Sequence, residues 1–315
     1  MKPKLTAMRM VLALSVATAT AACVASAASG GAKTAQGWTP AEQRAWYEAT
    51  QGSRLMPLSW FLALERPGST DRLADEKYLV ETFNYLPSRS GRQPQLPVGF
   101  AVDDNDDSKL SYSKLRWYAG QGSRERWLGM NCSACHTADI DYNGQTVRID
   151  GGAGLTDFQS FIETTDQALV ETRDDPARFA RFAARVLGKT RDNPRNRELL
   201  RGEMGKLIAW QEKTEQLNRA PVRYGFARLD AFGHIFNKIG MFVGADAPSV
   251  NPADAPVSYP FLWGIHLEDK LQWNGIAAPK TVKLGAGSLD VGALGRNTGE
   301  VIGVFGDVVV KRPSG

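Results

Sequence analysis

The chain has 315 residues, of which 43% are apolar and 23% charged, a composition typical of a folded globular protein. This composition excludes a disordered chain and an integral membrane bundle. The net charge is +4, but Lys2, Lys4 and Arg9 all precede the first long apolar run, and the rest of the chain carries 35 basic and 34 acidic residues. Nearly equal numbers of basic and acidic residues give no support to nucleic-acid binding, which requires a basic patch.

The first residues have the pattern of an export signal. An apolar run from Met10 to Cys23 follows the basic residues, and the small residues Ala25-Ser26-Ala27 form a cleavage site. The run is too short to span a membrane. We therefore predict that residues 1–27 are a cleaved signal peptide and that the mature protein is periplasmic or secreted, with no stable membrane span. The alternative is lipid anchoring through Cys23, against which Thr20 counts because an aliphatic residue is preferred there.

The segment between the leader and residue 131 predicts short helices and loops. Residues 28–37 are small and polar, which favours a flexible entry segment before a single domain over residues 38–315. Thr39, Pro40 and Glu42 form a helix start with a capping box. Further predictions are helical pieces at 60–64 and 78–86, surface loops at 87–97 and 103–107, and the last turns of a helix at 126–131.

The segment after residue 137 predicts a hairpin followed by long helices. Alternating residues at 138–142 and 146–150 flank Asn143-Gly144, which favours a type I′ turn. Caps and apolar periodicity predict helices at 156–172, 176–187, 194–217 and 228–239. Residues 247–275 are rich in proline and aromatic residues and predict a long ordered loop, and residues 301–310 predict a strand. The fold class expected is mainly α with a small β-hairpin.

Cys132, Cys135 and His136 form a C-x-x-C-H motif, the attachment sequence of c-type haem. Two thiols two residues apart reach the two haem vinyl groups, and the next residue is then held under the iron as its proximal ligand. A zinc site needs further ligands, and outside the leader the chain has no other cysteine. A thioredoxin-type dithiol needs a βαβ context that the sequence lacks. We predict one covalent haem c, beside which Trp127 and Met130 either pack on the porphyrin or form ordinary core.

The second axial ligand decides the chemistry of such a haem. A strong ligand favours electron transfer, and an open position favours reactions with peroxide or dioxygen. His234 lies opposite the apolar stripe of its predicted helix, which indicates a solvent-facing side chain. His266 lies in the aromatic loop and is the better candidate for a distal ligand or an acid–base group, with a structural polar role as the alternative. Met204 and Met241 are further candidates, although methionine in an apolar stretch usually packs.

Several stretches together resemble the N-terminal, first-haem half of the di-haem cytochrome c peroxidase-like proteins, the family that includes the rubber-cleaving di-haem oxygenases. The resemblance spans roughly residues 120 to 305. The stretches that carry it are Gly129–Thr137, Val147–Gly152, Tyr224–Ala231, Ala253–Trp263, Gln272–Gly275 and Arg296–Glu300.

The resemblance implies a cytochrome c-like haem domain with long loop insertions. It places Phe261, Trp263 and Trp273 near the distal face of the haem, where Tyr259 and His266 would complete the wall; ordinary aromatic core is the alternative for these rings. The family carries a second C-x-x-C-H motif, and this sequence has none. We therefore expect the second haem domain to lie beyond residue 315.

Two functions follow as hypotheses from these residues. The first is a haem peroxidase or haem-dependent oxygenase that uses peroxide or dioxygen and exchanges electrons with a redox partner. The second is a simple mono-haem electron-transfer protein with both axial positions occupied.

Overall fold

The computed structural model divides the chain into two units, Met1–Trp38 and Thr39–Gly315, and the structure describes the first unit only from residue 36. The residues that the structure describes are 36–88, 91, 94–244, 252–270, 275, 281–284, 287–290 and 292–310. The predicted signal peptide and most of the predicted entry segment lie outside them. None of the described helices is both long enough and apolar enough to cross a membrane.

Among the residues that the structure describes, 44% are helical and 14% lie in strands, so the class is mixed with more helix than strand. This confirms the expected class only at a coarse level. The helices are α2 (Pro40–Glu48), α3 (Leu58–Ala63), α4 (Glu76–Phe83), α5 (Phe158–Asp174), α6 (Pro176–Arg191), α7 (Pro194–Asn218), α8 (Ala231–Val243) and α9 (Gly292–Gly303), with 3₁₀ turns η1 (Cys132–Ala134) and η3 (Ile265–Leu267). The strands are β1 (Met56–Pro57), β2 (Phe100–Asp103), β3 (Trp127–Met130), β4 (Thr137–Tyr142), β5 (Gln145–Asp150), β6 (Arg228–Leu229), β7 (Val257–Ser258), β8 (Thr281–Leu284) and β9 (Gly287–Asp290).

The segment that leads into the C-x-x-C-H motif is a strand, and the predicted helix at 126–131 is wrong. β3 is the central strand of an antiparallel sheet in the order β1-β3-β2. All four of its residues are buried, and a short apolar run of this kind fits a strand covered on both faces as well as it fits a helix. Trp127 and Met130 belong to the hydrophobic core, so the core alternative applies to them.

A cluster of aromatic rings connects this sheet to α4 and α5. The ring of Phe161 on α5 lies 5.5 Å from that of Phe100 on β2 and 5.7 Å from that of Phe83 on α4. Tyr85 lies 4.8 Å from Phe100 in an edge-to-face arrangement, a geometry that aromatic pairs prefer. The core therefore fixes β3, and with it the start of the motif, against α5.

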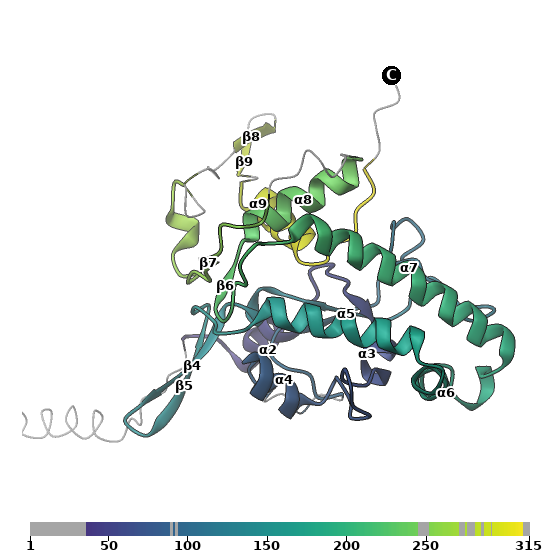
Figure 1. The fold of residues 1–315 in the computed structure, drawn as a ribbon. Helices are drawn as coiled ribbons and strands as arrows, with labels where there is room; N and C mark the ends of the chain where they lie inside the picture. Colours follow the sequence, from purple (N-terminus) through teal and green to yellow (C-terminus); the bar gives the residue numbers. More distant parts are fainter. Residues whose placement is uncertain are drawn as a thin grey trace, which may run out of the picture. The chain divides into compact units, whose positions relative to one another are not determined.

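The hairpin after the motif is confirmed. β4 and β5 pair antiparallel, with Tyr142 opposite Gln145 across a two-residue turn. Asn143 and Gly144 have φ angles of 49° and 73°, the left-handed values that a type I′ turn requires. Figure 1 shows this hairpin projecting from the rest of the second unit.

Capping residues set the helix starts as the sequence predicts. Thr39 forms the capping box of α2, and Asp175 and Asn193 cap α6 and α7. The sequence predicts that this helix ends before Gly188, and the regular helix does end there, because Gly188 has the non-helical angles φ 61° and ψ 178°. One more helical turn follows it, so α6 as a whole extends to Arg191. α5 and α7 run side by side (Figure 1).

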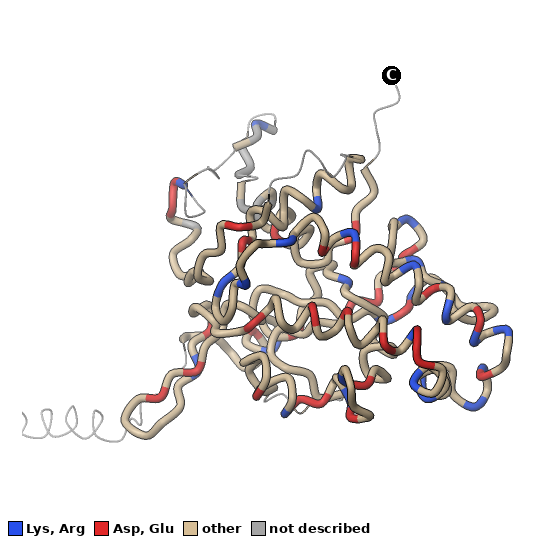
Figure 2. Tube along the Cα trace, viewed as in Figure 1, with Lys and Arg blue, Asp and Glu red and all other residues tan. Residues whose placement is uncertain are grey.

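Two predictions near the C-terminal end are wrong. Residues 301–303 belong to α9, which packs against α8, so the predicted strand at 301–310 begins as a helix. The predicted helix at 228–239 is also wrong at its start, because Arg228 and Leu229 form β6 and α8 begins at Ala231. In Figure 2, acidic and basic residues alternate along the described chain, in keeping with the near-neutral balance of the sequence.

Candidate functional site

One turn of backbone brings the three motif side chains together. The amides of Cys135 and His136 both donate to the carbonyl oxygen of Cys132, at 3.2 and 2.9 Å. The turn η1 therefore ends at Cys135, and His136 follows it directly. The two thiols and the imidazole are therefore carried by one tight turn and the residue after it, which is the arrangement that haem attachment requires.

Asn131 fixes this turn to the rest of the protein. Its side-chain oxygen accepts hydrogen bonds from the amide and hydroxyl of Ser133, at 3.0 and 2.6 Å. Its side-chain nitrogen donates to the carbonyls of Trp46 and Ala49 at the end of α2, at 3.0 and 3.1 Å. Because Asn131 is only 7% exposed, these bonds are shielded from water. Asn131 was not predicted from the sequence to have this role, although an Asn before a turn is a recognisable cap.

Gly99 packs against the same turn. Its carbonyl accepts from the amide of Asn131 at 2.9 Å, and its φ angle is +82°. A Cβ at this position would overlap the backbone of Ala134, so the close approach of β2 to the motif requires glycine.

The two thiols are free and neutral. Cys132 and Cys135 form no disulfide, and their sulfurs contact the Gln51 amide at 3.5 Å and the Thr156 hydroxyl at 3.8 Å. Burial raises the pKa of the Cys132 thiol, and burial raises that of Cys135 to about 11. A redox dithiol works through a thiolate with a lowered pKa. The pKa values of these two thiols are therefore shifted upward, whereas a thioredoxin-type pair has a thiol whose pKa is shifted downward.

His136 is oriented by a carbonyl from a distant part of the chain. Its Nδ1 lies 2.7 Å from the carbonyl oxygen of Pro260, which can only accept, so Nδ1 carries the proton. Burial lowers the pKa of His136, with a smaller opposing effect of the Pro260 bond, which favours the neutral ring. Nε2 makes no hydrogen bond to any residue that the structure describes. A neutral imidazole with Nδ1–H bonded and Nε2 free is the form in which histidine binds a metal.

The turn after β5 connects His136 to the Pro260 segment. The amide of Gly151 donates to the His136 carbonyl at 2.9 Å, and the Gly151 carbonyl accepts from the amide of Leu262 at 2.8 Å. The indole Nε1 of Trp263 donates to the carbonyl of Asp150 at 2.9 Å. This turn therefore holds both partners of the His136–Pro260 hydrogen bond.

The carboxylate of Asp150 ties the same turn to α2. It accepts from the Tyr47 hydroxyl at 2.6 Å and from the Gln43 amide at 2.8 Å. From the sequence, Asp150 could be placed at the end of the hairpin, but its bonds to α2 could not be predicted, because its partners lie more than a hundred residues away in the sequence.

The predicted aromatic residues divide into buried and exposed ones. Tyr259 is 6% exposed, and its ring centroid lies 6.3 Å from that of His136. Phe261 and Trp263 are 62% and 51% exposed and stack on each other at 5.7 Å. Trp273 and the side chain of His266 lie outside the described residues, although the backbone of His266 forms part of η3.

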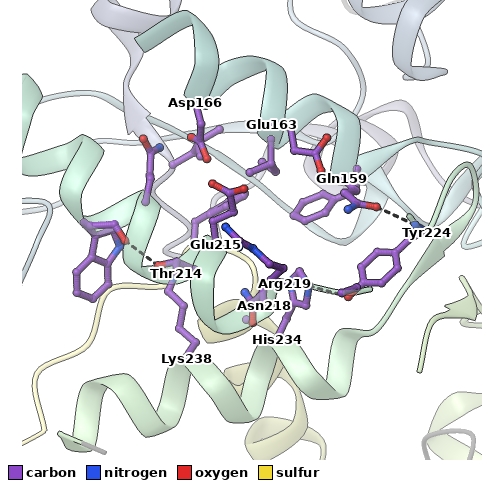
Figure 3. A pocket seen from close by; sticks show the side chains of 18 of the residues that line it. Gln159, Glu163, Asp166, Thr214, Glu215, Asn218, Arg219, Tyr224, His234 and Lys238 are labelled. Carbon is purple, nitrogen blue, oxygen red and sulfur yellow. Dashed lines mark hydrogen bonds between the residues drawn. The ribbon is translucent and has the colours of Figure 1, made fainter. Parts of the chain in front are cut away.

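The other ligand candidates have different surroundings. Met204 is fully buried in the core, and Met241 is 8% exposed on α8. His234 does not simply face solvent, and that prediction is wrong. Its Nε2 lies 3.4 Å from the Tyr224 hydroxyl, its ring packs near Phe158, and burial lowers its pKa to about 4. It lines a cavity between helices (Figure 3).

Within the described part of the chain, no group of three or more His, Cys, Asp or Glu side chains could hold a bare metal ion. A haem iron needs less from the protein, because the porphyrin supplies four of its ligands. The residues on this turn fit such a group, since they offer two free thiols and one imidazole nitrogen.

The chain is similar to the uncharacterized protein y4iJ of Sinorhizobium fredii (strain NBRC 101917 / NGR234). It is 31% identical over 281 residues, which is 85% of this chain and 44% of that protein. The chain therefore spans less than half the length of this relative. No protein-family model matches the chain, and no solved structure matches it.

Proposed function

We propose that the chain is an exported c-type haem protein that binds one haem through Cys132, Cys135 and His136. The hydrogen bond from His136 Nδ1 to the Pro260 carbonyl is the observation that carries this proposal. It adds to the sequence motif a feature that the motif does not contain: an imidazole oriented and protonated for ligation through Nε2. The proposed domain is cytochrome c-like around the motif, with long loop insertions.

The thiols support covalent attachment. Both are free, both lie on one turn, and neither has the lowered pKa of a redox dithiol. When bound, the haem supplies one-electron chemistry and, at an open axial position, binding of a small oxidant. The chain's own residues would hold the haem and orient the proximal imidazole.

The segment Tyr259–Trp263 supports the proximal ligand in this proposal. The sequence led us to expect Phe261 and Trp263 at the distal face, with His266. The hydrogen bond from His136 Nδ1 to the Pro260 carbonyl instead favours a place for this segment beside the proximal imidazole, because Nδ1 would point away from the iron if Nε2 ligated it. The exposed stack of Phe261 and Trp263 then forms an apolar edge next to that ligand.

The reaction we propose is haem peroxidase or oxygenase chemistry with peroxide or dioxygen, in exchange with a redox partner protein. Two candidates for a second strong axial ligand have other roles in the structure: Met204 packs in the core and His234 faces a cavity. These placements favour an exchangeable distal position. The simple mono-haem electron carrier remains the alternative, with His266 or Met241 as the second ligand.

Absorption spectra with carbon monoxide and with cyanide separate the two functions. The exchangeable site predicts rapid shifts of the Soret band when carbon monoxide is added to the ferrous protein or cyanide to the ferric protein. A spectrum that both ligands leave unchanged would instead support the electron carrier. Met241→Leu and His266→Ala are the matched variants, and ligand binding that appears only in one of them would identify that residue as the second ligand.

Export and the expected second haem domain are tested separately from the attachment of the haem to Cys132 and Cys135. The N-terminus of the purified protein tests the first: cleavage after Ala27 supports a secreted or periplasmic form, and a lipid on Cys23 supports an anchored one. The DNA beyond codon 315 tests the second, since a further C-x-x-C-H codon pattern would place a second haem domain there.

A further inference from the structure

A cavity of about 290 Å³ lies between α5, α7 and α8. None of Cys132, Cys135 and His136 lines it, so it is distinct from the haem-attachment turn. Part of its wall is apolar, formed by Leu55, Phe158, Ile162, Trp210 and Phe305. The remaining lining is polar and carries both acidic and basic residues, namely Glu163, Asp166, Glu215, Arg54, Arg219, Arg223 and Lys238. Figure 3 shows Asp166 entering from α5 and Lys238 from α8.

Two neighbouring helices of the cavity, α5 and α7, carry polar atoms that lack partners. The Oδ1 atom of Asp166 on α5 and both side-chain amide atoms of Gln211 on α7 are buried, and among the described residues they make no hydrogen bond. Burial, followed by the charges of Glu215, Glu212 and Glu163, raises the pKa of Asp166 to about 8. Buried polar groups without partners are costly, so this side of the cavity suits a ligand that donates hydrogen bonds and carries a positive charge.

The α8 side carries a buried cation. Lys238 is only 2% exposed, and its Nζ lies 5.7, 5.8 and 5.6 Å from the ring centroids of Tyr112, Trp210 and Phe305. No described carboxylate lies within ion-pair distance of this ammonium. The nearest acidic influence is Asp307, whose carboxylate oxygens accept hydrogen bonds from residues 111–113. An anionic group in the cavity would supply the missing counter-ion.

We propose that this cavity binds a small zwitterion of the amino-acid type. Its ammonium group would lie at Asp166 and Gln211, its carboxylate at Lys238, and its apolar side chain against Trp210 and Ile162. A ligand with only one charge would satisfy one side and leave the other unpaired. The size agrees with a small ligand, since pockets for drug-sized molecules begin at about 300 Å³. Exposed residues at the rim, Glu215 and Arg219 among them, give access from solvent.

Isothermal titration calorimetry on the full, haem-loaded chain tests this with three matched probes. The probes are L-leucine, 4-methylpentanoate, which lacks the ammonium group, and 3-methylbutylamine, which lacks the carboxylate. We expect leucine to bind at least about tenfold more tightly than either analogue, because hydrogen bonds to charged groups contribute strongly. Equal binding of either analogue, or no binding of leucine, would overturn the proposal.

Two variants locate the ligand. Lys238→Met and Asp166→Asn each keep the side-chain size. The first removes a positive charge, the second removes the carboxyl that would ionise beside the ligand's ammonium group, and each should weaken leucine binding at least about tenfold. Lys213→Met, on the exposed face of α7, is the matched control and should leave binding unchanged. Wild-type leucine affinity in Lys238→Met or in Asp166→Asn would contradict the assignment. The haem content of every variant should equal that of the wild type, so failure of this test leaves the haem proposal standing.

Discussion

The Cys132–His136 turn and the cavity between α5, α7 and α8 treat polar groups in opposite ways. On the turn, the side chains of Asn131 and Ser133 and the Nδ1 of His136 all have partners. In the cavity, Asp166 and Lys238 are buried without a counter-charge in contact. The comparison indicates that the hydrogen bonds of the turn stabilise one geometry. In the cavity, by contrast, buried polar groups without partners lower the stability of the fold and stay available to a ligand. Substitutions in the two regions should therefore have opposite effects on stability.

Replacing His136, the proximal ligand in the proposed haem protein, should have the largest effect. His136→Ala should remove the normal Soret position of the ferrous protein, because the iron loses its axial nitrogen, while the thioethers to Cys132 and Cys135 persist. Absorption spectroscopy and haem staining on a denaturing gel measure the two properties separately. His234→Ala is the matched control and should keep the wild-type spectrum. An unchanged ferrous spectrum in His136→Ala would rule out this residue as the ligand.

Asn131→Ala should strongly destabilise the motif turn. The variant loses the bonds to Ser133, Trp46 and Ala49 and leaves buried partners unsatisfied, at a cost of about 3 kcal/mol in the free energy of unfolding. Ser133→Ala removes one hydroxyl bond and should cost about 1 kcal/mol. Urea unfolding measures both. Equal losses in the two variants would show that Asn131 does not hold the turn through its amide.

Asp166→Asn should have the opposite sign and stabilise the protein at alkaline pH. The pKa of this carboxyl is raised from 3.8 to about 8 in the folded protein, so the folded state loses stability as pH rises from about 4 to about 8. Asparagine mimics the protonated acid and cannot ionise. At about 1.4 kcal/mol for each pKa unit, we expect the variant to be more stable than wild type by about 5 kcal/mol at pH 8 and nearly equal to it near pH 4.

Urea unfolding of Asp166→Asn and wild type at pH 4 and pH 8 measures this difference directly. The remaining charged groups that face the cavity, among them Glu163, Glu215 and Arg219, are common to both proteins and largely cancel. An advantage of the variant that is the same at both pH values would mean that ionisation of Asp166 is not its cause.

Trp263→Phe should have the smallest effect. The variant keeps an aromatic ring against Phe261 and loses the indole bond to the Asp150 carbonyl, which costs about 1 kcal/mol. Because this bond helps to hold the Pro260 carbonyl against His136, the haem reduction potential should shift slightly while attachment stays complete. Phe261→Ala, in which the indole bond is kept, is the control for loss of ring stacking. A larger shift in Phe261→Ala than in Trp263→Phe would contradict this role.

The parts of the site that the sequence predicted are local ones. The C-x-x-C-H motif, the hairpin turn at Asn143-Gly144 and the caps at Thr39, Asp175 and Asn193 each depend on residues a few positions apart. Hydrogen-bonding and turn geometry act over that range, so spacing alone reveals them.

The parts that the sequence did not predict depend on distant partners. Trp127–Met130 is a strand because β1 and β2 pair with it on both sides, and its four buried residues show no helical or strand period. The Pro260 carbonyl reaches His136 across 124 residues of sequence. His234 faces a cavity because α5 and α7 surround it, and the periodicity of α8 alone does not contain that information.

The mass of the intact polypeptide, after expression with the c-type maturation system, tests the central claim most directly. The account predicts that the wild-type chain carries the added mass of one haem after acidified-acetone extraction and that Cys132→Ala with Cys135→Ala carries none. Haem that is extracted from the wild type, or that stays on the double variant at the polypeptide mass, would contradict it.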